Sequence, residues 1–423
     1  MDRTPSLAST FSFVSTNRPR QKLQPNIIYH RVYDNLPTRS ELAPSQLTDE
    51  GVHHLPVPPP PPGPSSPRRD RTGILATAPI SPRPQNQNQN QNQSSRPELT
   101  QTKKLRLVCI SDTHNHASIP LPLGDILIHA GDLTNQGLHK ELSKQLLWLQ
   151  SQPHELKLII SGNHDGRTLD PSYSRKSQLP EDETTENNLA LFFTPEAEEK
   201  GIIYLCHEAR TLKLKDGRVI KVFASPLSPS EDGLWGFGYP EPEYLERSPW
   251  ANIPEDTDVV ITHTPARYHL DASPDFPAGR GPGGNHGCEY LRQALWGVRP
   301  LLHVCGHIHQ GRGVEKVRWD TEQRHVKYKE IEVKRIEDPF PDKARRQFLV
   351  DTVRRERIER GKETLMVNAS IATGSWKRGE GHPKAWGKPV VVDLEVTCVT
   401  ETVQETLERS GRAQEQPRPR PSW

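Results

Sequence analysis

A series of short apolar runs, each followed by a polar or glycine-containing turn, constrains the fold of this chain more than any other feature. The runs lie between residues 105 and 394 and read LRLVCI, DILIHA, LKLII, GIIYLC, DVVITH, PLLHVC, TLMVNAS and PVVVDL. Because both faces of each run are apolar, they are typical of strands buried in an α/β protein. Helical patterns at residues 137–151 and 288–298 favour mixed sheets covered by helices.

Two further segments have a local pattern of their own. Residues 210–226 predict a hairpin in which Asp216 and Gly217 form a type I′ turn. A charged segment at about 312–362 is predicted to be an insertion, and its stretch 342–361, DKARRQFLVDTVRRERIERG, is predicted to be an exposed helix.

The ends of the chain differ in composition from its middle. The 423 residues include 41 prolines and are only 32% hydrophobic, with a mean hydropathy of -0.76, which is too polar for one compact domain throughout. Residues 1–102, with PVPPPPPGPSSPRR and QNQNQNQNQ, predict a disordered Pro/Gln/Asn-rich arm, and residues 398–423 a disordered tail. The folded domain is therefore expected at 103–397. The proline run acts either as a spacer or as a ligand of an SH3- or WW-type domain.

Charge and cysteine content exclude several classes of partner. A net charge of +2, from 55 basic and 53 acidic residues, predicts no clear nucleic-acid or membrane partner. No apolar run approaches the roughly 20 residues of a membrane span, so we expect a soluble, intracellular and cytoplasmic protein. The cysteines at 109, 206, 288, 305 and 398 form no CxxC pair, which predicts reduced thiols and no thiolate zinc site.

Metal-capable side chains follow the apolar runs again and again. They are Asp112, His114, Asp132, Asn163, His164, His263, His307 and His309. Ligands of open α/β sheets bind at the carboxyl ends of the strands, so we expect these side chains to converge. A lone histidine such as His263 would more often be a satisfied core residue, but the conjunction of all these positions favours a metal site.

The order of these residues closely resembles the calcineurin-like metallophosphoesterase superfamily. Its pattern D-x-H, G-D, G-N-H-[D/E], H, G-H-x-H is matched at 112–114, 131–132, 162–165, 263 and 306–309. The stretches GDLTNQG, FASPLSP and VNAS resemble most the metallophosphoesterase-domain-containing (UPF0046-like) group, as a fungal-type member. The box GDLTN lacks the arginine of Ser/Thr protein phosphatases and the tyrosine of purple acid phosphatases. The resemblance implies a four-layer α/β/β/α sandwich of two mixed sheets flanked by helices.

The resemblance also implies a dinuclear metal centre. One metal would be held by Asp112, His114, Asp132 and His309, and the other by Asp132, Asn163, His263 and His307, so that Asp132 bridges the two. Carboxylate, amide and imidazole ligands suit Mn, Fe or Zn ions, whereas softer metals prefer thiolates.

The implied activity is hydrolysis of a phosphate ester, with phosphodiesters preferred, by attack of a metal-bridging hydroxide. The substrate would be a small phosphate ester such as a nucleotide. His164 would serve as general acid; Asp165 either orients that imidazole and stabilises its charged form or caps the following helix. The alternatives are a phosphomonoesterase or protein phosphatase, and a non-catalytic, metal-stapled scaffold that acts through the Pro-rich arm.

Four weaker candidates complete the analysis. Arg312 lies close enough in sequence to bind a non-bridging substrate oxygen, whereas His129 is expected to be a core or supporting residue. The aromatic stretch LWGFGY at 234–239 either stacks a base or is simply buried. The glycine-rich stretch 279–288 is expected to be a flexible loop rather than a phosphate cradle.

Overall fold

A computed structural model describes residues 101–174, 183–230, 235–240, 245, 248–273, 284–322, 327–341, 345–373 and 386–398. The predicted disordered arm and tail, with the proline run and its proposed SH3- or WW-type partner, lie outside the described residues except at their inner ends. Those inner ends are strand residues, because Gln101 begins the first described strand and Cys398 ends the last one.

The first large sheet has six strands and mixes parallel and antiparallel pairs. Its order is β13 (Phe348–Asp351), β15 (Val390–Cys398), β1 (Gln101–Ile110), β2 (Ile126–Ala130), β3 (Leu156–Ile160) and β4 (Ile202–Tyr204). Strands β1 to β4 pair in parallel, whereas β15 runs antiparallel to β1. The carboxyl ends of β1, β2 and β3 therefore meet at one edge.

The second large sheet has seven strands. Its order is β12 (Glu330–Ile336), β11 (Gly313–Trp319), β14 (Glu363–Asn368), β10 (Leu302–Cys305), β9 (Val259–Thr262), β6 (Val219–Ser225) and β5 (Glu208–Lys213). The four central strands β14, β10, β9 and β6 are parallel, and the outer pairs are antiparallel. A small third sheet pairs β7 (Ser228–Pro229) with β8 (Gly238–Tyr239).

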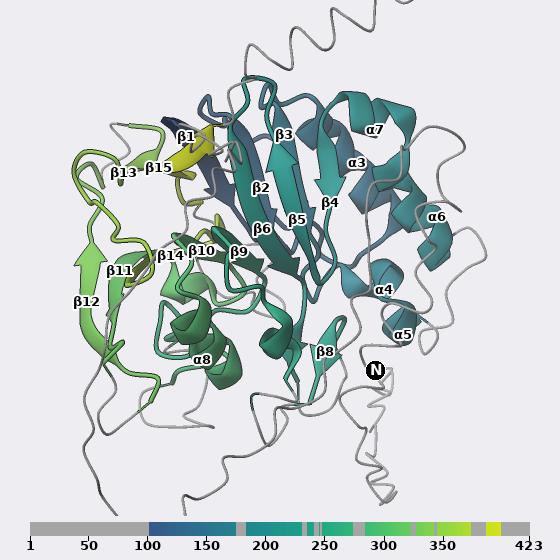
Figure 1. Ribbon diagram of the computed structural model, residues 1–423. Coiled ribbons are helices and arrows are strands. Elements are labelled where there is room, and N and C mark those ends of the chain that lie inside the picture. Colours follow the sequence, from purple (N-terminus) through teal and green to yellow (C-terminus); the bar gives the residue numbers. More distant parts are fainter. Residues whose placement is uncertain are drawn as a thin grey trace, which may run out of the picture. The chain divides into compact units, whose positions relative to one another are not determined.

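Helices lie against the outer faces of the two sheets (Figure 1). The described helices are α3 (His139–Gln150), α4 (Gly166–Leu169), α5 (Pro171–Ser174), α6 (Thr185–Ala190), α7 (Pro195–Glu199) and α8 (Glu289–Val298), of which α3 and α8 are the longest. The 3-10 turns are η2 (Leu191–Phe193), η4 (Pro249–Asn252) and η5 (His309–Gly311). The stretches predicted as helices at 137–151 and 288–298 are thus confirmed as α3 and α8.

Alternation along the strands produces the layers. Leu107 of β1 and Val304 of β10 belong to one buried cluster, which joins the facing sides of the two sheets. Val108, the next residue of β1, belongs instead to the cluster that holds Leu142 of α3. The same cluster packs Leu291 of α8 with residues of the second sheet. The predicted four-layer arrangement of helix, sheet, sheet and helix is therefore confirmed.

Two local predictions are wrong. In the hairpin between β5 and β6, Gly217 has a φ of 85° but Asp216 has no positive φ, so the turn is not type I′. Gly217 donates to the carbonyl of Leu214 at 3.0 Å, and Leu214 pairs with Arg218, which describes a type I turn closed by a glycine bulge.

The predicted helix at 342–361 is also absent from its described part, residues 345–361. Phe348 and Val350 alternate inward as β13, in parallel with β15, and turns follow. The period-two burial of these two residues outweighs the helical tendency of the surrounding arginines and glutamates. The whole segment predicted as an insertion supplies β11 and β12 to one sheet and β13 to the other.

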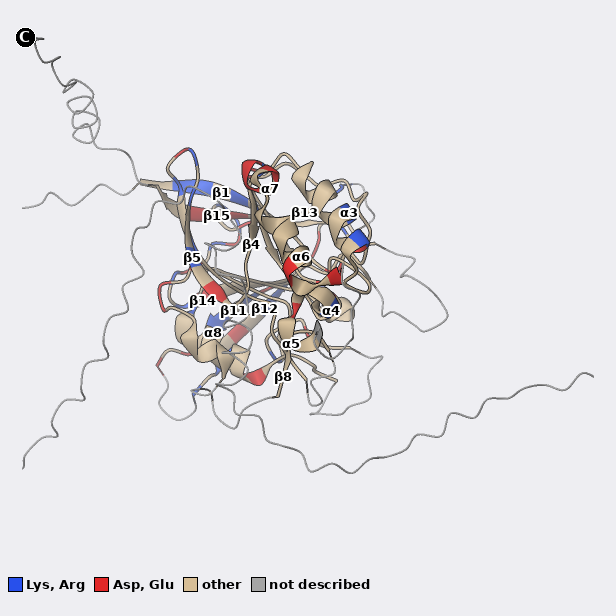
Figure 2. Ribbon diagram, turned by 90° about the vertical axis from the view of Figure 1, so that its right-hand side faces the viewer, with Lys and Arg blue, Asp and Glu red and all other residues tan. Residues whose placement is uncertain are grey.

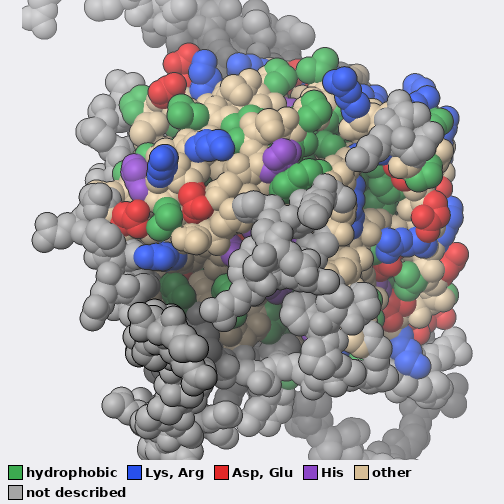
Figure 3. All heavy atoms as spheres, turned by 180° about the vertical axis from the view of Figure 1, so that it is seen from behind, with side chains coloured by type: hydrophobic (Ala, Val, Ile, Leu, Met, Phe, Trp, Pro, Cys, Tyr) green, Lys and Arg blue, Asp and Glu red, His purple; other side chains and the backbone are tan. Residues whose placement is uncertain are grey.

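Charged residues on the described surface are paired across strands or interspersed. Arg106 of β1 contacts Asp393 of β15 at 2.7 Å, and Lys104 contacts the same carboxylate at 3.4 Å, so a basic strand lies beside an acidic one (Figure 2). Figure 3 shows positive and negative side chains mixed over the face opposite to that of Figure 1. This mixture agrees with the small net charge of the whole chain.

Two further predictions, made from the composition of the chain, concern its cysteines and membrane spans. All five cysteines are buried and free of disulfides, as predicted. Within the part of the chain that the structure describes, no helix is both long and apolar enough to cross a bilayer.

Candidate metal centre

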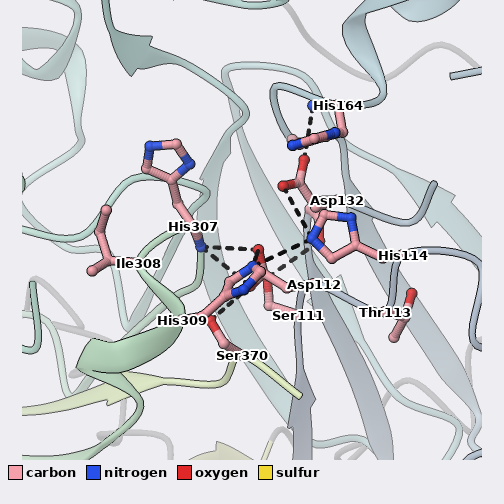
Figure 4. Close-up of polar contacts among 12 residues, drawn as sticks. Ser111, Asp112, Thr113, His114, Asp132, His164, His307, Ile308, His309 and Ser370 are labelled. Carbon is pink, nitrogen blue, oxygen red and sulfur yellow. Dashed lines mark hydrogen bonds and ion pairs between the residues drawn. The ribbon is translucent and has the colours of Figure 1, made fainter. Parts of the chain in front are cut away.

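The predicted site residues follow the carboxyl ends of parallel strands, and these strand ends lie on the same side of both sheets. Asp112 follows β1, Asp132 follows β2 and Asn163 follows β3, whereas His263 and His307 follow β9 and β10 of the second sheet. Figure 4 shows the side chains of Asp112, His114, Asp132 and His309 pointing toward one another. Thr113 and Ile308, which alternate with them, point away.

A parallel bridge joins the two sheets at this edge. Ser111, directly after β1, pairs with Ser370, just beyond β14, and its amide donates to the carbonyl of Ala369 at 3.0 Å. Gly306 allows this approach, because a Cβ there would overlap the side chains of Ser111 and Asp112. The glycine of the G-H-x-H box is therefore needed to bring the sheets together.

The first group of ligand atoms consists of Asp112, His114 and His309, whose donor atoms all lie within 4.8 Å of one another. Nε2 of His309 lies 3.3 Å from Oδ1 of Asp112 and 3.3 Å from Nε2 of His114. Asp112 and His114 lie in the loop after β1, and His309 begins η5, which follows β10.

Asp132 links that group to a second one. Its Oδ2 lies 3.8 Å from Nε2 of His114 on one side and 3.4 Å from Nε2 of His263 on the other. His307 completes the second group, with its ring 4.9 Å from that of His263. Oδ1 of Asn163 lies 3.0 Å from Nε2 of His263. The structure thus brings together all seven residues that the sequence predicts as ligands.

The hydrogen bonds of the two histidines beside Asp132 direct their lone pairs into the site. Nδ1 of His263 donates to the carbonyl of Ala130 at 2.9 Å, and Nδ1 of His114 to that of Thr134 at 3.2 Å. When these two imidazoles are neutral, each Nε2 carries a lone pair. That lone pair points at an oxygen or nitrogen atom of another site residue, which also carries a lone pair. Such facing lone pairs repel one another unless a positive charge lies between them, and the oxygen and imidazole donors fit a metal ion of the Mn, Fe or Zn kind.

The charges of the site show the same need for a cation. Burial opposes ionisation of both aspartates, but His309 lowers the pKa of Asp112 and His263 lowers that of Asp132. Burial likewise opposes a charge on His263, but Asp132 and its hydrogen bond raise the pKa of this imidazole to about 9. By contrast, burial lowers the pKa of His307 to about 3. The two ionised carboxylates and the neutral His307 already have the protonation states that metal ligands require, whereas His263 would release its proton when a cation replaces it beside Asp132.

Strained backbone accompanies these side chains. Asp112, His114, Asp132 and His307 have φ values of 55°, 42°, 53° and 67°, in the left-handed region that residues other than glycine rarely adopt. Each such residue lowers the stability of the folded protein by on the order of 1–3 kcal/mol. The fold tolerates this strain at the residues whose side chains point into the site.

His164 lies at the border of the first group. Its amide donates to Oδ1 of Asp132 at 2.9 Å, and its ring is 4.9 Å from the ring of His114. Nδ1 of His164 lies 2.8 Å from the carbonyl of Asn135, which fixes Nδ1 as the donor and leaves Nε2 for another partner. His164 also forms a potential ligand group with His114 and Asp132.

Asp165 has neither of the roles weighed from the sequence. Its carboxylate accepts from the amides of Leu133, Thr134 and Gly162 and from the Thr134 hydroxyl, at 2.7 to 3.1 Å. It makes no side-chain cap for α4, and the His164 ring is held by Asn135 instead. Burial and the charge of Asp132 raise the pKa of Asp165 to about 6. This residue therefore holds the ligand-bearing loops together rather than orienting the imidazole.

Ser370 is a site residue that the sequence did not single out. Its hydroxyl donates to Oδ2 of Asp112 at 2.7 Å from just beyond the carboxyl end of β14. The signal was its place in TLMVNAS, a buried run with polar residues at its end like the others.

Two weaker candidates have structural roles. Arg312 is half-buried, and its guanidinium donates to the carbonyls of Ser370 (2.7 Å) and Lys388, so it supports the site rather than facing it. Burial lowers its pKa to about 10. His129 is a buried core residue whose Nε2 contacts the Thr113 hydroxyl at 2.9 Å, as expected.

Comparison with known proteins defines the class. A family model described as calcineurin-like phosphoesterase matches residues 105–311, which hold the whole set of strand-end ligand residues. Metallophosphoesterase domain-containing protein 1 of Homo sapiens is 37% identical over 217 residues, which are 49% of this chain and 62% of that protein. UPF0046 protein C25E10.12 of Caenorhabditis elegans is 35% identical over 218 residues, 50% of this chain and 71% of that protein.

The chain therefore belongs to the calcineurin-like phosphoesterase family, in the group of metallophosphoesterase domain-containing and UPF0046 proteins. A protein named probable rhamnogalacturonate lyase C, from Emericella nidulans, is 44% identical over 227 residues, which are 53% of this chain but only 19% of that protein. Because the chain spans 62% of the human relative and 19% of this one, neither name decides the activity of the whole chain.

Proposed function

We propose that this protein is a metal-dependent phosphoester hydrolase that uses two metal ions and prefers small phosphodiesters. One observation carries the proposal above all: the carboxylate of Asp132 lies between His114 on one side and His263 on the other, at 3.8 and 3.4 Å. A carboxylate between two sets of nitrogen and oxygen donors is the arrangement that a bridged pair of metal ions requires.

The ligands divide naturally between two ions. One ion would be held by Asp112, His114, Asp132 and His309, and the other by Asp132, Asn163, His263 and His307. When bound, Mn, Fe or Zn ions would polarise the phosphate and supply an activated water for attack on phosphorus. The bond between phosphorus and the water oxygen forms while the bond to the alcohol oxygen breaks.

His164 is proposed as the group that protonates the departing alcohol. Because Nδ1 is held by the carbonyl of Asn135, only Nε2 can deliver a proton to a bound substrate. The amide of His164 also binds Asp132, so the ring keeps a fixed position relative to the metal ligands. A neutral alcohol leaves far more easily than an alkoxide, and this protonation is most valuable for alkyl esters.

The test measures metal content and hydrolysis together on the full chain. Elemental analysis should find about two metal ions per chain, and chromogenic diesters should be hydrolysed faster than the matched monoesters. Asp132→Ala should lose both metal and activity. His164→Ala should keep the metal and lose about 100- to 10,000-fold in rate, the usual contribution of general acid catalysis.

Asp256→Asn is the matched control, since Asp256 is an exposed residue that pairs with Lys221. A metal-loaded chain that is inert on both kinds of ester would contradict the hydrolase proposal and favour the scaffold. Faster turnover of monoesters would contradict only the diester preference.

A further inference from the structure

Trp235 is a large apolar side chain that the fold leaves open to solvent. It is 56% exposed, although other residues of its stretch, such as Phe237 and Tyr239, are almost completely buried. Its ring lies 5.4 Å from the ring of His164, tilted by 45°. The described part of this stretch, residues 235–239, is therefore divided in role: two of its aromatic residues belong to the core, and one faces outward beside the site.

The backbone holds Trp235 firmly in this position. Gly236 packs directly on Gly166, which begins α4 just after the loop that carries Asn163 and His164, and a Cβ on either glycine would overlap the other residue. The next amide, that of Phe237, donates to Oδ2 of Asp170 at 2.7 Å. Because the backbone next to Trp235 packs without space against the start of α4, this position of the chain stays beside His164.

The rings of the site form a row that leads outward from the metal ligands. His114 contacts the other ligands, His164 lies edge-on to His114 at 4.9 Å, and Trp235 lies beyond His164. A phosphate bound at the ligand groups would place its departing oxygen near His164. The rest of the departing alcohol would then extend toward the exposed indole.

We propose that Trp235 determines substrate specificity by stacking on the departing alcohol, so that the preferred substrates are phosphate esters whose leaving group carries a flat ring. The inference rests on the proposed function and names its substrate class. Stacking on an aromatic side chain strengthens binding about 5- to 150-fold and requires only a π face, so nucleosides and simple arylmethyl alcohols are both accepted.

The experiment compares methyl benzyl phosphate with methyl cyclohexylmethyl phosphate, two diesters that differ in the flatness of one ring. The full-length protein should hydrolyse the benzyl ester with a kcat/KM about tenfold higher. Trp235→Leu should abolish this preference by lowering only the benzyl value, and Trp235→Phe should restore most of it. Equal effects of Trp235→Leu on both esters, or no effect on either, would overturn the inference.

A binding measurement separates this inference from the proposed function. Calorimetric titration with the methyl esters of benzylphosphonic and cyclohexylmethylphosphonic acid requires no turnover and should show the same dependence on Trp235. Phe193→Leu serves as the control, because Phe193 is a partly exposed aromatic residue of the outer helical layer. If neither diester is hydrolysed, the proposed function fails while the titration still decides the role of Trp235.

Discussion

The hydroxyl of Ser370 lies 2.7 Å from Oδ2 of Asp112 and donates a hydrogen bond to it across the junction of the two sheets. Asn368 fixes the serine, because its Oδ1 accepts from the amide of Ser370 at 3.1 Å while its Nδ2 donates to the carbonyl of Ile308 at 2.8 Å. The carboxylate from the first sheet is thus oriented by a residue from the second.

Ser370→Ala should weaken metal binding without unfolding the protein. Residues that orient a metal ligand typically contribute about 10- to 100-fold to metal affinity. The measurement is a competition of the full chain with a calibrated chelator for Mn²⁺ or Zn²⁺. The matched control is Ser151→Ala, since that exposed hydroxyl bonds only to the carbonyl of Trp148 and the side-chain amide of Gln152, at the end of α3. The same metal affinity in both variants would show that Ser370 does not support the site.

Asp165→Asn should destabilise the folded protein by about 2 kcal/mol. The buried carboxylate accepts from four donors, whereas an amide turns its own N–H groups toward donors that then lose their acceptor. Urea unfolding of the full chain should give a lower midpoint with an unchanged slope. Asp256→Asn, on the surface, should shift the midpoint little. Equal midpoints for the two variants would refute the role assigned to Asp165.

The residues proposed as metal ligands could be located from the sequence because their positions depend on local patterns. Each of Asp112, Asp132, Asn163, His263 and His307 lies within three residues of a buried strand end, and parallel strands place their carboxyl ends at one edge. Apolar runs identify such strands even when the neighbouring strands of the sheet are not known. The same reasoning located the strands at the eight apolar runs, and helical periodicity located the two longest helices.

What could not be predicted depends on contacts between distant segments. The bond from Ser370 to Asp112 requires the register of two sheets, which no local pattern records. Asp165 was assigned to its neighbour His164, but its four donors belong mainly to the loop after β2. Residues 342–361 have a helical composition, yet the buried side chains of Phe348 and Val350 pair with β15 as a strand.

Gly306→Ala should strongly weaken metal binding, because the new methyl group would overlap the side chains of Ser111 and Asp112 and push β10 away from β1. Gly297→Ala is a matched substitution on α8, where a Cβ meets no atom within 4 Å. It should leave metal binding intact and raise stability by about 0.5–1 kcal/mol, as expected for glycine in a helix. Thermal unfolding with and without added Mn²⁺ measures both effects. Equal metal-induced stabilisation in the two variants would contradict the steric argument.

His269 should make the stability of the protein depend on pH. Its Nδ1 lies 2.6 Å from Glu315 and its Nε2 3.2 Å from Glu330, so both ring nitrogens donate only when the imidazole is protonated. Burial opposes this charge, but the two glutamates raise the pKa of His269 to about 9. The same interactions outweigh burial at Glu330 and lower the pKa of that carboxyl to about 2.

The direction of the pH effect follows from these values. A histidine with a pKa of about 6.5 in the unfolded chain and about 9 in the folded one stabilises the fold fully below pH 6.5, and the stabilisation is lost as the pH rises through 9. We expect a loss of about 2 kcal/mol between pH 7 and pH 9.5, measured by urea unfolding at fixed metal concentration. His269→Gln should unfold more easily at pH 7 and show much less change over that interval. If the wild-type protein and the variant respond alike to pH in this range, another group carries the dependence and His269 is neutral in the folded protein.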